Sequence, residues 1–176
     1  MERIIWGVPS FWIERFPLYY GRWRGLFEKR GIDLGIRNCW GGPELAAAVS
    51  KGGLWIGEMG LPPFLTAISD GLPARVIGSS VVQQLDHYLV ARPEIAKMTD
   101  LRGRRIGILS AGSCDDYFAR SMLEASGLDP ETDVTLVPLG TAYGDLRCFS
   151  PSPASCIPRV EAGFLVEPFV ARAERL

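Results

Sequence analysis

The stretch from 101 to 140 constrains the fold most, because it describes one complete strand–helix–strand unit. Arg105 to Leu109 predicts a short apolar strand, and Ser110 to Ser113 a turn of small residues whose hydroxyls are suited to cap a helix. Apolar residues then recur at helical spacing, at Tyr117, Phe118, Met122 and Leu123. The helix should end at Gly127, before a second strand from Val134 to Pro138. The turn would aim backbone N–H groups at one point, which favours a small anion or a ligand carbonyl.

The first half of the chain predicts the same alternation of strands and helices. Strands are expected at Ile4 to Val8, Ile32 to Arg37 and Leu54 to Glu58, with further extended runs at Arg75 to Ser79, Val81 to Gln84 and His87 to Ala91. Helices are expected at Pro17 to Lys29, Glu44 to Ser50 and Phe64 to Ser69. This order predicts an α/β fold with a parallel sheet, right-handed crossovers and function at the carboxyl ends of the strands.

Two lobes built on one plan are indicated by a repeated pattern. Gly53 to Met59 resembles Val160 to Val166, and the second run belongs to a strand predicted from Arg159 to Val166. We expect lobe one to cover residues 1–88 and lobe two residues 89–176, with the crossover in 85–93.

The charge balance excludes some classes of partner. A net charge of −1 with 22% charged residues gives no reason to expect nucleic acid or an acidic membrane as a partner. The four cysteines form no C-x-x-C pair, so we expect packed thiols, with no metal and no cofactor. The N-terminus lacks the organisation of a signal peptide. We expect a cytoplasmic protein if Met1 is the native start, and a periplasmic or lipid-anchored one if a signal was removed.

Loops that follow strands and precede helices supply the candidate ligand-binding residues. In lobe one these are Ser10, Phe11, Trp12, Trp40, Gly41, Gly42, Met59 and Gly60, and the crossover adds Gln83. In lobe two they are Ser110, Gly112, Ser113 and Glu167. Trp12 and Trp40 offer aromatic faces for a planar ligand with a polar or anionic group, although they would also pack between helices. The serines would equally serve as helix caps alone, and Glu167 as an N-terminal helix charge.

Three residues are candidates for catalysis, and two of them have a structural alternative. His87 is the only histidine, and a lone histidine is more often a hydrogen-bonded structural residue. Cys114 begins the predicted helix, where the dipole favours a thiolate, or it is a packed thiol. Arg75 is the third candidate.

Seven short segments recur along the chain in a characteristic order: Pro9-Ser10, Pro17-Leu18-Tyr19, Gly25 to Asp33, Gly57 to Gly60, Leu101 to Gly107, Tyr117 to Leu128 and Gly163 to Phe169. With these segments the chain resembles the solute-binding family of nitrate, alkanesulfonate and thiamine-pyrimidine-precursor importers. The resemblance covers nearly the whole chain in order, and no single motif is diagnostic.

The resemblance implies a type 2 periplasmic-binding-protein fold, with mostly parallel sheets flanked by helices in two lobes that close over a small ligand in their cleft. It implies an importer-type binding protein that traps a small aromatic or anionic organic solute and works with an ABC importer permease. The alternative is a cytosolic enzyme on the same scaffold, a decarboxylase or desulfinase-like protein acting on an aromatic acid. A third possibility is a remnant that pairs with another copy as a homodimer.

Three departures from the family pattern affect these expectations. Relatives continue past the segment ending at Phe169, so lobe one would lack its returning C-terminal segment. Residues 145–158 carry three prolines where relatives have a helix, which predicts a loop. Trp55 stands where relatives commonly carry an aspartate at the start of a strand.

Overall fold

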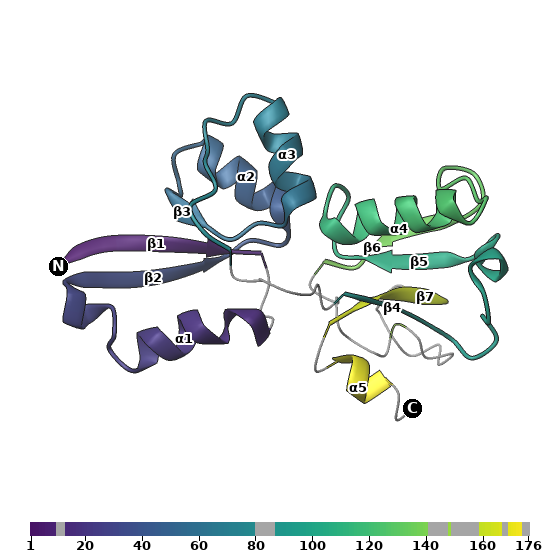
Figure 1. Ribbon diagram of the computed structural model, residues 1–176, viewed down its shortest axis with the longest axis horizontal. Coiled ribbons are helices and arrows are strands. Elements are labelled where there is room, and N and C mark those ends of the chain that lie inside the picture. The colour runs from purple at the N-terminus through teal and green to yellow at the C-terminus, as the bar shows by residue number, and fades with distance from the viewer. Residues whose placement is uncertain (10–12, 80–86, 141–147, 149–158, 167–168, 174–176) are drawn as a thin grey trace. The chain divides into compact units, whose positions relative to one another are not determined.

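The computed structural model describes residues 1–9, 13–79, 87–140, 148, 159–166 and 169–173. The chain divides into two compact units, Met1–Leu85 and Asp86–Leu176. Each unit has its own sheet with helices packed against it (Figure 1). In the described part of the chain, no helix has the length and apolar character needed to cross a membrane.

The sheet of the first unit is entirely parallel. It contains β1 (Glu2–Val8), β2 (Ile32–Asn38) and β3 (Ile56–Gly57), in the order β2-β1-β3. Trp6 lies opposite Ile36 on one side and Ile56 on the other. The parallel sheet predicted from the strand–helix alternation is therefore confirmed.

Helices cover both faces of this sheet, because successive residues of a strand point to opposite sides. The helices are α1 (Phe16–Trp23), α2 (Gly42–Ser50) and α3 (Leu61–Ser69), with short 3-10 helices η1 (Ile13–Arg15) and η2 (Glu28–Arg30). Val8 and Leu34 pack with Leu18 of α1 on one face. Leu45 of α2 and Leu54 form a separate cluster and lie closest to Gly7, whose neighbours in β1 point to the other face. Figure 1 shows α1 and the α2–α3 pair on opposite sides of the strands.

Three predicted elements of this unit differ from the structure, and the first is the strand expected from Leu54 to Glu58, which is only Ile56–Gly57. The helix expected from Pro17 to Lys29 ends at Trp23, and Gly25 follows in a left-handed conformation with φ +65°. The extended run from Arg75 to Ser79 forms no strand, and most of it is exposed. Val81 to Gln84 lies outside the described residues.

The sheet of the second unit is mixed. It contains β4 (Tyr88–Ala91), β5 (Arg105–Ile108), β6 (Thr135–Pro138) and β7 (Ala162–Leu165), in the order β4-β7-β5-β6. Strand β7 pairs antiparallel with β4 and parallel with β5. Strands β5 and β6 pair in parallel, with α4 (Cys114–Ala125) between them in sequence. The predicted βαβ unit is therefore present.

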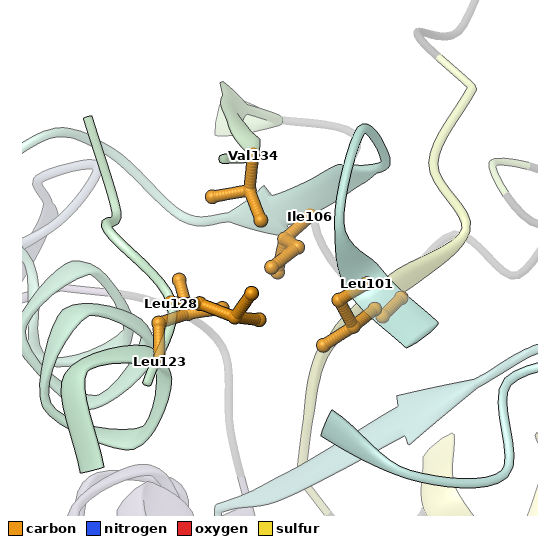
Figure 2. Close-up of a cluster of buried hydrophobic side chains, with 6 residues drawn as sticks. Leu101, Ile106, Leu123, Leu128 and Val134 are labelled. Atoms are coloured by element: carbon orange, nitrogen blue, oxygen red, sulfur yellow. The ribbon is translucent and has the colours of Figure 1, made fainter. Parts of the chain in front are cut away.

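The core of the second unit is built mainly by α4 against the sheet. Leu101, Ile106, Leu123, Leu128, Val134 and Ala162 form one buried cluster, and the labelled side chains converge in Figure 2. Leu101 belongs to the 3-10 helix η3 (Met98–Leu101), which precedes β5. The short helix α5 (Phe169–Ala173) packs separately, through Val170 against Leu165.

Candidate functional site

The sequence candidates that the structure describes lie at the carboxyl ends of parallel strands, in the loop after β2, the loop after β3 and the turn after β5. Ser10, Phe11, Trp12, Gln83 and Glu167 lie outside the described residues.

In the first unit, a buried arginine lies between two glutamates near the carboxyl ends of the parallel strands. Glu14, Arg15 and Glu58 are called the Arg15 cluster. The Arg15 guanidinium lies 2.7 Å from the Glu14 carboxylate and 3.4 Å from the Glu58 carboxylate. Arg15 is 6% exposed and precedes α1 directly, whereas Glu58 follows β3. The Glu58 backbone N–H donates to Gly7 O of β1, which fixes Glu58 against the strand end.

Burial and charge act together on the groups around this cluster. Burial raises the pKa of Glu58, and the neighbouring Arg15 offsets this only in part. Burial also raises the pKa of the Tyr19 hydroxyl on α1, with Arg15 acting in the opposite direction. The positive charge of Arg15 therefore offsets only part of the free-energy cost of burying the ionised Glu58 carboxylate.

This raised pKa predicts a pH-dependent contribution of Glu58 to stability. A raised folded-state pKa gives a stabilisation that is fully present below the ordinary glutamate pKa of about 4.3 and is lost as pH rises through the raised value. Relative to Glu58→Gln, the wild-type protein should lose free energy of unfolding as pH rises from about 4 toward neutrality. Urea denaturation of both proteins across this range measures the difference. The exposed Glu28→Gln is the control, and a wild-type advantage that grows with pH would contradict the prediction.

The loop after β2 leads into α2 through a sharp bend. Trp40 is 38% exposed, and its backbone N–H donates to the Glu44 carboxylate at 2.9 Å. Gly41 has φ +99°, a conformation that favours glycine, and its N–H donates to Pro9 O. Burial raises the pKa of the Cys39 thiol just before this loop, and Glu44 adds to the effect. Cys39 is therefore held as a packed, neutral thiol.

Gly42, a predicted ligand-binding residue, allows α2 to approach α3 closely. A Cβ at Gly42 would lie 2.6 Å from Cβ and Cγ of Pro63, atoms of a rigid ring. Met59 packs against the cluster that contains Leu45, and Gly60 is the N-cap of α3.

Gly42→Ala should lower the free energy of unfolding by about 1–3 kcal/mol, because the added methyl group overpacks this contact. Denaturant titration provides the measurement. Gly78→Ala is the matched control, because a Cβ there meets no atom within 4 Å. Equal effects of the two substitutions would contradict the packing argument.

In the second unit, two buried aspartates occupy the turn after β5, which is termed here the Asp115 turn (Leu109–Asp116). Leu109 N–H donates to the Asp115 carboxylate at 3.1 Å, and Gly112 N–H donates to the Asp116 carboxylate at 2.7 Å. Asp115 is 1% exposed and Asp116 is 6% exposed. Both carboxylates lie in the first turn of α4, where the helix dipole stabilises negative charge.

The predicted cap by serine hydroxyls is wrong. Ser113 is the N-cap residue of α4, but its side chain makes no cap hydrogen bond. Its Oγ instead accepts a long, 3.4 Å hydrogen bond from Ser110 N–H. The N–H groups of Leu109, Ser110 and Gly112 thus already donate to side chains of the protein, where the sequence suggested a small anion.

The catalytic candidates are distributed over both units. His87 Nε2 lies 3.6 Å from Asp115 Oδ1, and the His87 ring meets Phe118 edge-on. Cys114 is the first residue of α4 and is partly buried, whereas Arg75 is an exposed residue of the first unit. His87 therefore lies beside a buried carboxylate. Among the residues that the structure describes, no group of three His, Cys, Asp or Glu side chains is placed to hold a metal ion.

Sequence reasoning did not select Arg15, Glu58, Asp115 or Asp116. A charged pair directly before the apolar helix beginning at Phe16 was the available signal for Arg15. Consecutive aspartates at a helix start normally indicate a solvated N-terminus, so nothing in the sequence pointed to their burial.

A family model described as NMT1/THI5 like matches residues 12–145 of this chain. A protein of Brucella abortus (strain 2308), named provisionally as a binding protein, is 30% identical over 105 residues, which are 60% of this chain and 32% of that protein. The match thus spans about a third of that relative.

Solved structures share the fold. The alkanesulfonate-binding protein SsuA from Xanthomonas axonopodis pv. citri, bound to MOPS, matches with a TM-score of 0.67 and 19% identity, covering 96% of this chain and 56% of that protein. The periplasmic nitrate-binding protein NrtA from Synechocystis PCC 6803 matches with a TM-score of 0.67 and 14% identity, covering 97% of this chain and 48% of that protein. The chain therefore spans about half the length of these two proteins, and at these identities the likeness establishes the fold.

Proposed function

Because the chain belongs to the NMT1/THI5-like family and has the periplasmic-binding-protein fold, we propose that it is a substrate-binding component of an ABC importer. In this role it binds a small aromatic or anionic organic solute and delivers it, unchanged, to an importer permease. The names of the relatives support a binding role. The Brucella protein is named as a binding protein, and the two solved structures are an alkanesulfonate-binding protein and a nitrate-binding protein.

The position of the Arg15 cluster in the first unit is the structural observation that best supports a binding role. The Arg15 cluster lies at the carboxyl edge of a parallel sheet, which is where α/β folds of this kind place their ligands. Trp40, at the end of the neighbouring strand, adds an exposed aromatic side chain to the same edge. Charged groups and an aromatic face at one edge suit a small solute with both a polar and a planar part.

The enzyme alternative receives less support from the described residues. His87 lies beside the buried carboxylate of Asp115, and Arg75 belongs to the other unit.

Mass spectrometry of small molecules retained by the purified chain tests the proposal. We expect a retained organic solute that, when added back, raises the melting temperature in proportion to the logarithm of its concentration. The solute should be recovered chemically unchanged after prolonged incubation. Recovery of a converted product, or a melting temperature that no retained molecule raises, would overturn a binding role.

A further inference from the structure

We propose that the outer face of α1, with the basic segment that follows it, docks onto an anionic phospholipid surface. The aromatic side chains of this face lie among the lipid headgroups, and its basic side chains contact the phosphates. The inference goes beyond the binding of a solute and does not depend on it.

Helix α1 exposes its bulky aromatic side chains and buries smaller residues, the reverse of the usual arrangement in a surface helix. Phe16, Tyr20 and Trp23 are exposed, and their spacing of four and three residues places them on one face. The Phe16 and Tyr20 rings stack with centroids 5.4 Å apart, and the Tyr20 and Trp23 centroids lie 5.8 Å apart. These three side chains are called the aromatic ladder.

The core of the first unit is formed without the aromatic ladder. Leu18, on the inner side of α1, packs against Val8 and Leu34. The Phe27 ring lies beside Gly21, where an added Cβ would be only 3.0 Å from it. In the part of the chain that the structure describes, no buried cluster contains a ladder residue. A row of exposed aromatic side chains that the core does not use indicates an interaction surface.

Basic residues accompany the ladder, although the net charge of the whole chain is −1. Residues 16–30 contain a single carboxylate, that of Glu28. The same segment contains four cations, all of them exposed: Arg22, Arg24, Lys29 and Arg30. The Arg24 guanidinium lies 5.9 Å from the ring centroids of both Tyr20 and Trp23, so positive charge is in contact with the ladder itself. An anionic surface is therefore the complementary partner.

The size of the ladder favours a lipid surface over a folded protein. A helix of eight residues is about 12 Å long and about 10 Å wide, whereas a stable protein interface covers about 800 Å² on each partner. A membrane surface needs no matching pocket. Tryptophan and tyrosine side chains are enriched at the level of the headgroups, and nearby arginine and lysine side chains are attracted to anionic lipids.

Cosedimentation of the intact chain with phospholipid vesicles tests the inference. Vesicles of pure phosphatidylcholine are compared with vesicles of phosphatidylcholine and phosphatidylglycerol in equal parts. We expect a partition coefficient at least about tenfold higher for the anionic vesicles, and a decrease as the salt concentration is raised. Equal partition onto both kinds of vesicle, or binding to neither, would overturn the inference. Binding of polyglutamate without binding of anionic vesicles would also overturn it, and would indicate an acidic protein partner instead.

Substitutions on α1 and η2 locate the surface. Trp23→Ala should reduce partition onto the anionic vesicles about tenfold, and Trp23→Phe should restore part of this loss. The double variant Arg24→Gln with Lys29→Gln should reduce it about 30-fold and remove most of the difference between the two kinds of vesicle. Because all three positions are exposed, denaturant titration should give wild-type stability for these variants.

Matched controls remove the same groups from other exposed positions. Trp55→Ala removes a tryptophan that is 93% exposed before β3. The double variant Lys51→Gln with Arg104→Gln removes two exposed cations outside residues 16–30. Both controls should bind the anionic vesicles as the wild type does. Vesicle binding that survives the α1 and η2 variants, or that falls equally in the controls, would contradict the assignment to this face.

Discussion

Replacing Asp115 with alanine is expected to lower the free energy of unfolding by roughly 3 kcal/mol, because buried donors lose their acceptor at about 1–3 kcal/mol each. Leu109 N–H would lose the carboxylate to which it donates at 3.1 Å, and His87 Nε2 would lose the carboxylate oxygen that lies 3.6 Å away. The Asp115 side chain is 1% exposed, so little water is available to replace these contacts. Urea or guanidinium denaturation measures the change.

Two further variants separate the effect of the hydrogen bond that Asp115 accepts from the effect of removing a carboxylate from α4. Asp115→Asn keeps an oxygen that can accept from Leu109 N–H, so its loss should be smaller than that of the alanine variant. Glu124→Ala removes a carboxylate from the exposed C-terminal part of the same helix and should stay within about 0.5 kcal/mol of the wild type. A loss for Asp115→Ala as small as this control would show that the buried aspartate does not hold the turn.

Leu123→Ala is expected to cost about 2–5 kcal/mol of unfolding free energy. Leu123 has no exposed surface and contributes to the cluster of Figure 2, where α4 packs against Ile106 and Val134. Truncation removes buried apolar surface and leaves a cavity that the surrounding strands can fill only in part. The large effect follows from the complete burial of the Leu123 side chain.

The neighbouring Met122 provides the matched control. Met122 belongs to the same helix but is 39% exposed, so Met122→Ala should cost well under half as much as Leu123→Ala. Differential scanning calorimetry with denaturant titration can follow both. Similar losses for the two variants would mean that α4 does not bury the face assigned to it.

The alternation of strands and helices was accessible from the sequence because it depends on local patterns. Apolar runs such as Ile4 to Val8, and glycines such as Gly127 after α4, report directly on burial and on helix termination. The end of α1 was missed, since Gly25 interrupts an apolar pattern that continues to Phe27. The run from Arg75 to Ser79 has strand-like composition, but a strand also needs a neighbour to complete its hydrogen bonds.

The candidate site was less accessible, because its charges are buried by contacts between distant segments. Arg15 and Glu58 meet only once β1 and β3 are paired, and no local pattern encodes that meeting. Asp115 is buried because it accepts from Leu109 at the end of the preceding strand. The loop positions at the strand ends could be predicted from topology, whereas the chemistry that occupies them depended on tertiary structure.

The position of β7 also has a consequence for the order in which the second unit forms during synthesis. Ala162–Leu165 emerges from the ribosome after β4, β5 and β6, yet it lies between β4 and β5 in the finished sheet. Until it arrives, β4 and β5 each present an unpaired edge for about 70 and 55 residues of translation, at a rate of roughly 5–20 residues per second. Several seconds of exposed strand edge are long enough for chaperone binding or for pairing with another nascent chain. The last-made strand of the sheet is therefore the one that ends this vulnerable interval.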